Sequence, residues 1–201
     1  MLDLLDYRRT VSELYAKVRE QDANESIYPT WCEKRNTLFR IHSQSALDDE
    51  QKAKFTGLVY YDYDPAYDVV GDFNSDVEPK EYHIDVGDDG EIHTKQIGNV
   101  TFTLPTGTGT LSVFWIMGYG GGIFIPFGDT TNKITTYGAG RYLLDTIKGA
   151  DLGIREGKLV MNFNYAYNPS CSYNYRWVCP LAPPESKVDF EIPVGEKVLT
   201  I

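Results

Sequence analysis

The sequence has no long apolar run and no cluster of basic residues, and each absence excludes a class of protein. Its 201 residues carry 19 Lys and Arg against 29 Asp and Glu, which gives a formal net charge of −10. Such a chain repels phosphate backbones unless basic residues gather locally, and the longest basic cluster is Arg8-Arg9. Glycines and a proline divide the most apolar segment, residues 110–127, into pieces of strand length. We therefore expect neither a nucleic-acid partner nor a membrane partner.

Cysteine is scarce, and the N-terminal residues are not typical of a secretion signal. Acidic residues interrupt residues 1–20 before an apolar run of signal-peptide length is reached, which predicts a cytoplasmic location. Thiols usually stay reduced there. Besides Cys32, the chain has Cys171 and Cys179, which enclose seven residues, a wider spacing than the roughly two to four residues between paired zinc ligands. We favour two buried free thiols beneath an aromatic loop over a disulfide, and a disulfide over a metal clasp.

Familiar catalytic and cofactor motifs are also missing. The chain has no Gly-x-Ser-x-Gly elbow, and the glycine-rich residues 118–122 precede a strand-like segment instead of the helix that a phosphate cradle needs. We predict a tight turn there and no cofactor. His83, Asp85, Glu91 and His93 are expected to share one face of a hairpin. A solvated polar face is our interpretation of that group, with a divalent metal site as the alternative.

The residues that are plentiful predict the fold. Tyrosine (15 residues) and glycine (18 residues) suit pleated strands joined by tight turns. Apolar residues recur with helical spacing in residues 1–56, and Asp48 precedes Gln51 by three residues, as in a capping box. From residue 57 the period becomes two. We predict a single domain (1–201) of the mainly β, α+β class, in which a helical segment (1–56) packs outside an antiparallel barrel or sandwich (57–201).

Period-two alternation and turn residues predict the individual strands. A hairpin is expected over residues 80–97, where Asp-Gly lies in a short polar turn. The other strands are expected at 57–64, 66–73, 99–105, 110–118, 122–127, 133–144, 158–167 and 187–194.

Polar side chains on two of these strands need partners. Asn162 and Asn164 share one face of the strand predicted at 158–167, and asparagine is depleted in strands because its amide competes with the backbone ladder. Arg141 follows two glycines in an apolar strand and requires an anionic partner. We favour Asp129 as an internal partner, with a bound ligand as the alternative.

Several of these segments resemble a known family. The runs at 124–143, 162–186 and 192–197, with 55–67 upstream, are similar to the family catalogued as domain of unknown function 1684, and the resemblance covers roughly residues 30–197. The positions that it implies to be characteristic are Asp129, Thr136, Tyr137, Gly140, Arg141, Asn164, Tyr167, Asn168, Pro169, Cys171, Cys179 and Pro180.

The chain departs from that pattern at two positions. Asn162 replaces a usual Asp, and Gly128 stands where a basic residue is common. An asparagine side chain cannot exchange a proton near neutral pH. A binding role therefore fits this chain better than acid–base chemistry at residue 162.

The leading hypothesis is that the β-rich domain binds a small anionic or hydroxylated ligand, because polar residues on apolar strands commonly orient ligands in pockets. The first alternative is a hydrolase-type enzyme that uses Cys171 or Asp129 near Arg141. The second is a structural or protein-interaction domain with the Tyr-rich segment as its surface. The residues that we predict to contact the ligand are Arg141, Tyr137, Tyr142, Asn162, Asn164 and Asn168.

Overall fold

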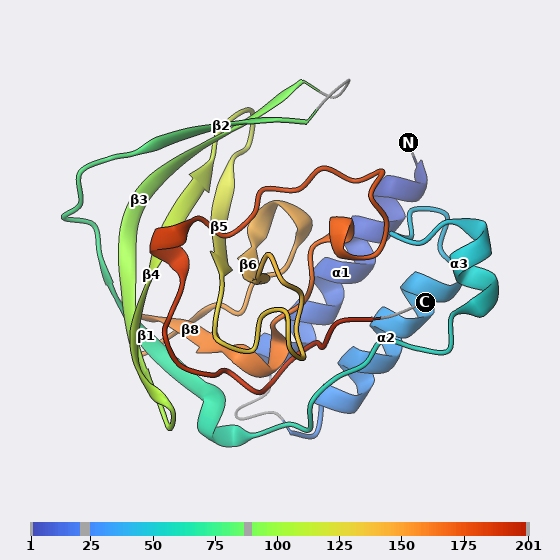
Figure 1. The fold of residues 1–201 in the computed structure, drawn as a ribbon, viewed down its shortest axis with the longest axis horizontal. Coiled ribbons are helices and arrows are strands. Elements are labelled where there is room, and N and C mark those ends of the chain that lie inside the picture. The colour runs from blue at the N-terminus through green and yellow to red at the C-terminus, as the bar shows by residue number, and fades with distance from the viewer. Residues whose placement is uncertain (1, 21–24, 87–89, 200–201) are drawn as a thin grey trace.

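The computed structural model describes residues 2–20, 25–86 and 90–199, and it shows a mostly antiparallel sheet that curves into a half-barrel beside N-terminal helices (Figure 1). The predicted α+β class with a barrel-like sheet is confirmed. The helices are α1 (Leu2–Glu20), α2 (Tyr28–Ile41) and α3 (Asp49–Lys54). The strands are β1 (Asp68–Asn74), β2 (Glu81–Asp85), β3 (Glu91–Leu104), β4 (Gly107–Ile116), β5 (Gly122–Phe127), β6 (Arg141–Asp145), β7 (Ile154–Arg155) and β8 (Lys158–Asn162).

The sheet runs in the order β6-β5-β4-β3-β1-β8-β7, and β2 pairs with the first part of β3. Strand β1 connects the two parts of the sheet, because residues 72–74 pair with β3 and residues 68–71 pair with β8. At this changeover a Cβ atom on Gly71 would lie 2.3 Å from the Val100 side chain. The glycine therefore allows the close approach that lets one strand serve both halves of the sheet.

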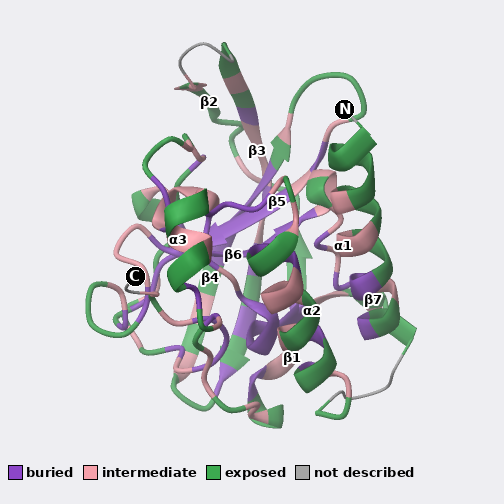
Figure 2. Ribbon diagram, turned by 90° about the vertical axis from the view of Figure 1, so that its right-hand side faces the viewer, coloured by how far each residue is buried: buried purple, intermediate pink, exposed green. Residues whose placement is uncertain are grey.

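The helices follow the predicted apolar stripes. Helix α1 buries Leu14, Tyr15 and Val18, and these residues share one core with α2 and the strands. Asp48 and Gln51 form the predicted capping box at the start of α3. Figure 1 shows the three helices on one side of the sheet. Figure 2 shows that the buried residues, in purple, concentrate on the central strands. Among the described helices, none combines the length and the apolarity that a membrane crossing requires.

Most of the predicted strands form. The hairpin is present as β2 and β3, although its turn residues 87–89 lie outside the described residues. Strand β3 continues through the segment predicted as a separate strand at 99–105, with a register shift between Gln96 and Gly98. The strands predicted at 66–73, 110–118 and 122–127 correspond to β1, β4 and β5.

Two of the predicted strands are shorter than expected. In the segment 133–144, only the end forms β6, since the residues before it make backbone hydrogen bonds within turns, such as that from the Thr135 N–H to the Thr131 carbonyl at 3.0 Å. In the segment 158–167, β8 ends at Asn162. The Asn162 side chain accepts from the Asn164 N–H and caps a 3-10 turn, Phe163–Tyr165.

Two further segments are extended without forming strands of the sheet. Residues 57–64 and 187–194 were both predicted as strands, and the described chain has only isolated bridges there, Tyr60 with Glu196 and Gly128 with Lys187. The Tyr61 N–H nevertheless donates to the Gly195 carbonyl at 2.9 Å. The C-terminal segment is therefore held beside the chain that follows α3, which places Glu196 near the helices.

Candidate functional site: a cavity between the helices and the C-terminal loop

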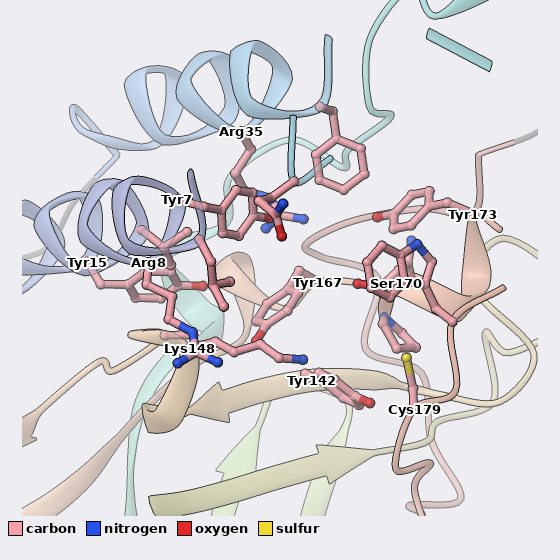
Figure 3. Close-up of a pocket in the computed structure, with 18 of the residues that line it drawn as sticks. Tyr7, Arg8, Tyr15, Arg35, Tyr142, Lys148, Tyr167, Ser170, Tyr173 and Cys179 are labelled. Carbon is pink, nitrogen blue, oxygen red and sulfur yellow. The ribbon is translucent and has the colours of Figure 1, made fainter. Parts of the chain in front are cut away.

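A cavity of about 260 Å³ lies between α1, α2 and residues 167–179, which we call the cysteine loop. Strand β6 and the short 3-10 helix Thr146–Lys148 complete its wall. Figure 3 labels these lining side chains: Tyr7, Arg8 and Tyr15 from α1, Arg35 from α2, Tyr142 from β6, Lys148, and Tyr167, Ser170, Tyr173 and Cys179 from the cysteine loop.

The charge of this cavity is opposite to that of the chain. Its lining includes the cationic side chains of Arg8, Arg35 and Lys148, and none of the described lining residues is an aspartate or a glutamate. The Lys148 ammonium group lies 3.5 Å from the Asp145 carboxylate, and its side chain is half exposed. In a chain with a net charge of −10, the cavity lining is therefore rich in cationic side chains, of which Lys148 pairs with Asp145 and Arg35 with Glu196 behind the wall.

Arg35 is held in place by a buried network. Its guanidinium donates to the Glu196 carboxylate at 2.6 Å and to the Tyr60 hydroxyl at 3.2 Å, and it lies 5.0 Å from the Tyr167 ring centroid. Glu196 is fully buried and also accepts from the Tyr173 hydroxyl. The carboxylate thus joins α2, the cysteine loop and the C-terminal segment at one point.

The remaining lining is aromatic, with few polar atoms. Burial raises the pKa of Tyr7 above its ordinary value, so this phenol stays neutral and able to donate near pH 7. The Tyr142 hydroxyl donates to the Pro180 carbonyl at 2.6 Å. The Asn168 amide nitrogen donates to Glu196 and to the Lys197 carbonyl, whereas its Oδ1 is buried without a hydrogen-bond partner in the described part of the chain. That oxygen is an unused acceptor on a cavity-lining residue.

Two thiols meet in the cysteine loop. The Cys171 backbone N–H donates to Cys179 Sγ at 3.3 Å, and both cysteines are free and half-buried. The pKa of Cys179 is lowered by hydrogen bonds from the Cys171 thiol and from the Cys171 N–H, aided by the positive Lys148 and opposed by burial. The same thiol contact, together with burial, raises the pKa of Cys171.

Arg141 and Asp129 lie away from this cavity, in the core. Arg141 is completely buried and donates to Asp129 at 2.6 Å and to the Ile192 carbonyl at 2.8 Å. The internal ion pair favoured by the sequence is therefore confirmed. Gly140 enables it: at φ +98° a Cβ atom there would meet the Phe127 carbonyl oxygen at 2.4 Å. The hydrolase hypothesis paired Cys171 or Asp129 with Arg141, but the neighbours of Cys171 are Cys179 and Tyr137.

The other predicted ligand contacts divide between the cavity and internal contacts. Tyr142 and Asn168 line the cavity, and their role as ligand contacts stays a prediction. Asn164 exchanges hydrogen bonds with the backbone of residue 64, both at 2.9 Å, and Asn162 caps the adjacent 3-10 turn. The Tyr137 hydroxyl lies 3.9 Å from Cys171 Sγ. The structure therefore does not gather all six predicted residues around one cavity.

Sequence reasoning missed Arg8, Arg35 and Lys148. A signal for Arg35 was present, because it follows Trp31 by one helical turn and precedes Phe39 by another, so a charge interrupts the buried stripe of α2. Arg8 and Lys148 carry no comparable signal, since their approach depends on how α1 packs beside β6.

The predicted histidine cluster forms on the β2–β3 hairpin. His83 and His93 are directly opposite each other, and Asp85 pairs in register with Glu91. Ligand atoms of His83, Glu91 and His93 lie within 4.8 Å of one another, and all three residues are exposed. The shared polar face is confirmed, and its chemistry could hold a divalent metal ion.

Fold and cavity together define a class of protein: an antiparallel α+β half-barrel with N-terminal helices and a C-terminal loop around a positive, aromatic cavity. Residues 53–197 match the model of the family described as a protein of unknown function, DUF1684. The chain belongs to this family, and the resemblance seen in its motifs is confirmed.

The fold is also found among solved structures. One of them is the solution NMR structure of an uncharacterised protein from Haloarcula marismortui, with 25% sequence identity and a TM-score of 0.61. The similarity covers 86% of this chain and 93% of the Haloarcula chain. No curated protein matches the sequence.

Proposed function

We propose that the protein binds a small organic anion in the cavity between α1, α2 and the cysteine loop. The observation that carries this proposal is the reversal of charge. Three cations and no carboxylate line the cavity among the described residues, although acidic groups outnumber basic ones in the whole chain. A concave site with low-dielectric walls strengthens the attraction between such cations and an anion.

Lys148 and Arg8 are the cations that an incoming anion would meet. The Lys148 ammonium group lies 3.5 Å from the buried Asp145 carboxylate, and the lysine side chain is half exposed. An ammonium group has three donors, so Lys148 can keep its contact with Asp145 and still donate to a ligand carboxylate. Arg35 is already neutralised by Glu196, so its role is to present a flat, hydrogen-bonded surface next to Tyr167.

The cavity also constrains the rest of the ligand. Its volume of about 260 Å³ is below the ~300–1,000 Å³ typical of pockets for drug-sized molecules. Aromatic side chains such as Tyr7 and Tyr142 form much of its wall. The chemistry that fits is a small carboxylate with an aromatic or short aliphatic part.

Calorimetric titration with matched carboxylates and amides tests the proposal. We expect benzoate and hexanoate to bind, and benzamide and hexanamide to bind at least about tenfold more weakly, since the charge contributes at least ~1.4 kcal/mol. Arg8→Gln and Lys148→Gln should each weaken benzoate binding. Arg9→Gln is the matched control, because Arg9 is an exposed neighbour on α1 outside the cavity lining. Equal losses for Arg8→Gln and Arg9→Gln, or equal binding of acid and amide, would contradict the proposal.

A further inference from the structure

We propose that Cys179 and Cys171 form a hydroperoxide-oxidisable dithiol, in which Cys179 attacks the peroxide and Cys171 then closes a disulfide. This inference is independent of the ligand proposal, since it requires only access of a small oxidant to the cysteine loop.

The first support is geometry. The backbone N–H of Cys171 points at Cys179 Sγ across 3.3 Å, so the sulfur of Cys179 lies next to the residue with which it would be linked. The Tyr137 hydroxyl, 3.9 Å from Cys171 Sγ, contacts the other thiol. Both cysteines lie in one short loop, and a disulfide between them would enclose only the seven residues 172–178.

The second support is the difference between the two sulfurs. The nucleophile in thiol chemistry is the thiolate, and the Cys179 pKa is lowered by donors from Cys171 and by Lys148, whereas the Cys171 pKa is raised. Cys32 provides an internal contrast, because burial raises its pKa to about 11. Of the two sulfurs, Cys179 is therefore the one whose surroundings favour the thiolate.

The third support is access. Cys179 is part of the cavity lining, together with Lys148 and Tyr142. The cavity, at about 260 Å³, is several times larger than the ~30 Å³ that one water molecule occupies. A peroxide molecule can therefore enter beside the sulfur, where Lys148 can stabilise the oxygen anion that leaves.

The chemistry balances with a hydroperoxide as the only co-reactant. The Cys179 thiolate attacks one peroxide oxygen, the O–O bond breaks, and the departing alkoxide or hydroxide takes up a proton, which leaves Cys179 as a sulfenic acid. Cys171 then attacks that sulfur, the S–O bond breaks, and water leaves with the thiol proton. In total, two thiols and one hydroperoxide give one disulfide, one water and one alcohol (a second water for hydrogen peroxide). Two electrons pass from sulfur to oxygen.

The test is oxidation of the full chain by hydrogen peroxide at pH 7, followed by peptide mass mapping and by trapping of sulfenic acid with dimedone. We expect a Cys171–Cys179 disulfide in the wild type and in the control Cys32→Ser. Cys171→Ser should stop at a dimedone-reactive Cys179. Cys179→Ser should consume peroxide at least about tenfold more slowly, because a thiol with an ordinary pKa near ~8.5 is only a few per cent ionised.

A measurement on the unmodified chain guards against variants that fail to fold. Pulsed alkylation with isotopically distinct iodoacetamides compares the three cysteines within the same molecule, and Cys179 should react fastest. Absence of the Cys171–Cys179 cross-link after peroxide treatment, or alkylation of Cys179 no faster than that of Cys32, would overturn the proposal.

Discussion

Arg141 is buried and Arg35 is partly buried, and each donates to a carboxylate at 2.6 Å, yet the two arginines lie in different kinds of surroundings. Arg141 is enclosed by the core, and its pair with Asp129 has no exposed side-chain surface on either residue. Arg35 lines the cavity, where its partner Glu196 is fully buried but the arginine retains a small exposed surface.

A charged residue in an apolar segment does not by itself indicate a ligand site. Arg141 gave the stronger sequence signal, and its donors are taken up by Asp129 and by backbone carbonyls of the C-terminal segment. Arg35 gave the weaker signal and lies beside open space. The distinguishing feature is the cavity, with cations from α1 and from the chain after β6.

The largest effect is expected from breaking the enclosed pair. Asp129→Asn preserves shape but leaves the Arg141 charge buried without a counter-ion, which should lower the free energy of unfolding by about 3–5 kcal/mol. Urea unfolding followed by circular dichroism measures this loss. Adding Arg141→Met to Asp129→Asn should not deepen the loss, because the unpaired charge is then removed. A loss below about 1 kcal/mol for Asp129→Asn would show that solvent reaches Arg141 after all.

The equivalent substitution at the cavity, Glu196→Gln, should lower the free energy of unfolding by less than Asp129→Asn does. Glu196→Gln removes the partner of Arg35, but the amide can still accept a hydrogen bond and the guanidinium can be solvated from the cavity. We expect a loss of about 2 kcal/mol in the same urea assay. Benzoate should also stabilise Glu196→Gln more than it stabilises the wild type, since Arg35 then lacks its counter-ion. If Glu196→Gln lowers the free energy of unfolding as much as Asp129→Asn does, the Arg35 and Arg141 ion pairs are equally enclosed.

The elements that the sequence predicted are those in which local pattern and final packing agree. Leu14, Tyr15 and Val18 form a stripe whether or not the rest of the chain is known, and the Asp48–Gln51 capping box is a contact between near neighbours. The strand prediction was too long at Asn162–Asn164. There, a short polar side chain bonds to nearby backbone and replaces the ladder, which alternation alone does not reveal.

The candidate site was less predictable than the fold, because its parts come from distant segments. The thiol pair and Tyr142 were singled out from the sequence, but the positive charge of Arg8 and Lys148 depends on where α1 packs. The acidity of Cys179 depends on the hydrogen bonds from the Cys171 thiol and the Cys171 N–H and on the approach of Lys148. Such contacts have no signature in residue spacing.

A smaller effect is expected in the pH dependence of the rate at which Cys179 is alkylated. Its pKa is lowered on folding, so the thiolate contributes stability above the ordinary thiol pKa of ~8.5 and loses that contribution as the pH falls through the lowered value. The alkylation rate of Cys179 should accordingly reach half its maximum below pH 8.5, and at pH 7 it should exceed the rate of Cys32 by about tenfold or more. Rates measured by mass spectrometry from pH 5 to pH 9 give the profile. A midpoint at or above pH 8.5 would contradict a lowered pKa for Cys179.

The smallest expected effect is a slower alkylation of Cys179 when the proposed ligand is bound. This prediction rests on both proposals. An anion near Lys148 weakens the attraction that this lysine exerts on the Cys179 thiolate, so saturating benzoate should raise the Cys179 pKa from its lowered value of about 6 and slow its alkylation at pH 6 by about twofold. Benzamide should have no such effect, and Lys148→Gln should slow alkylation without benzoate and remove most of the further slowing by benzoate. Protection of Cys179 by benzamide as strong as that by benzoate would indicate steric blocking of the cavity. No change with benzoate, in a chain shown by calorimetry to bind it, would mean that the anion and the thiol occupy separate parts of the cavity.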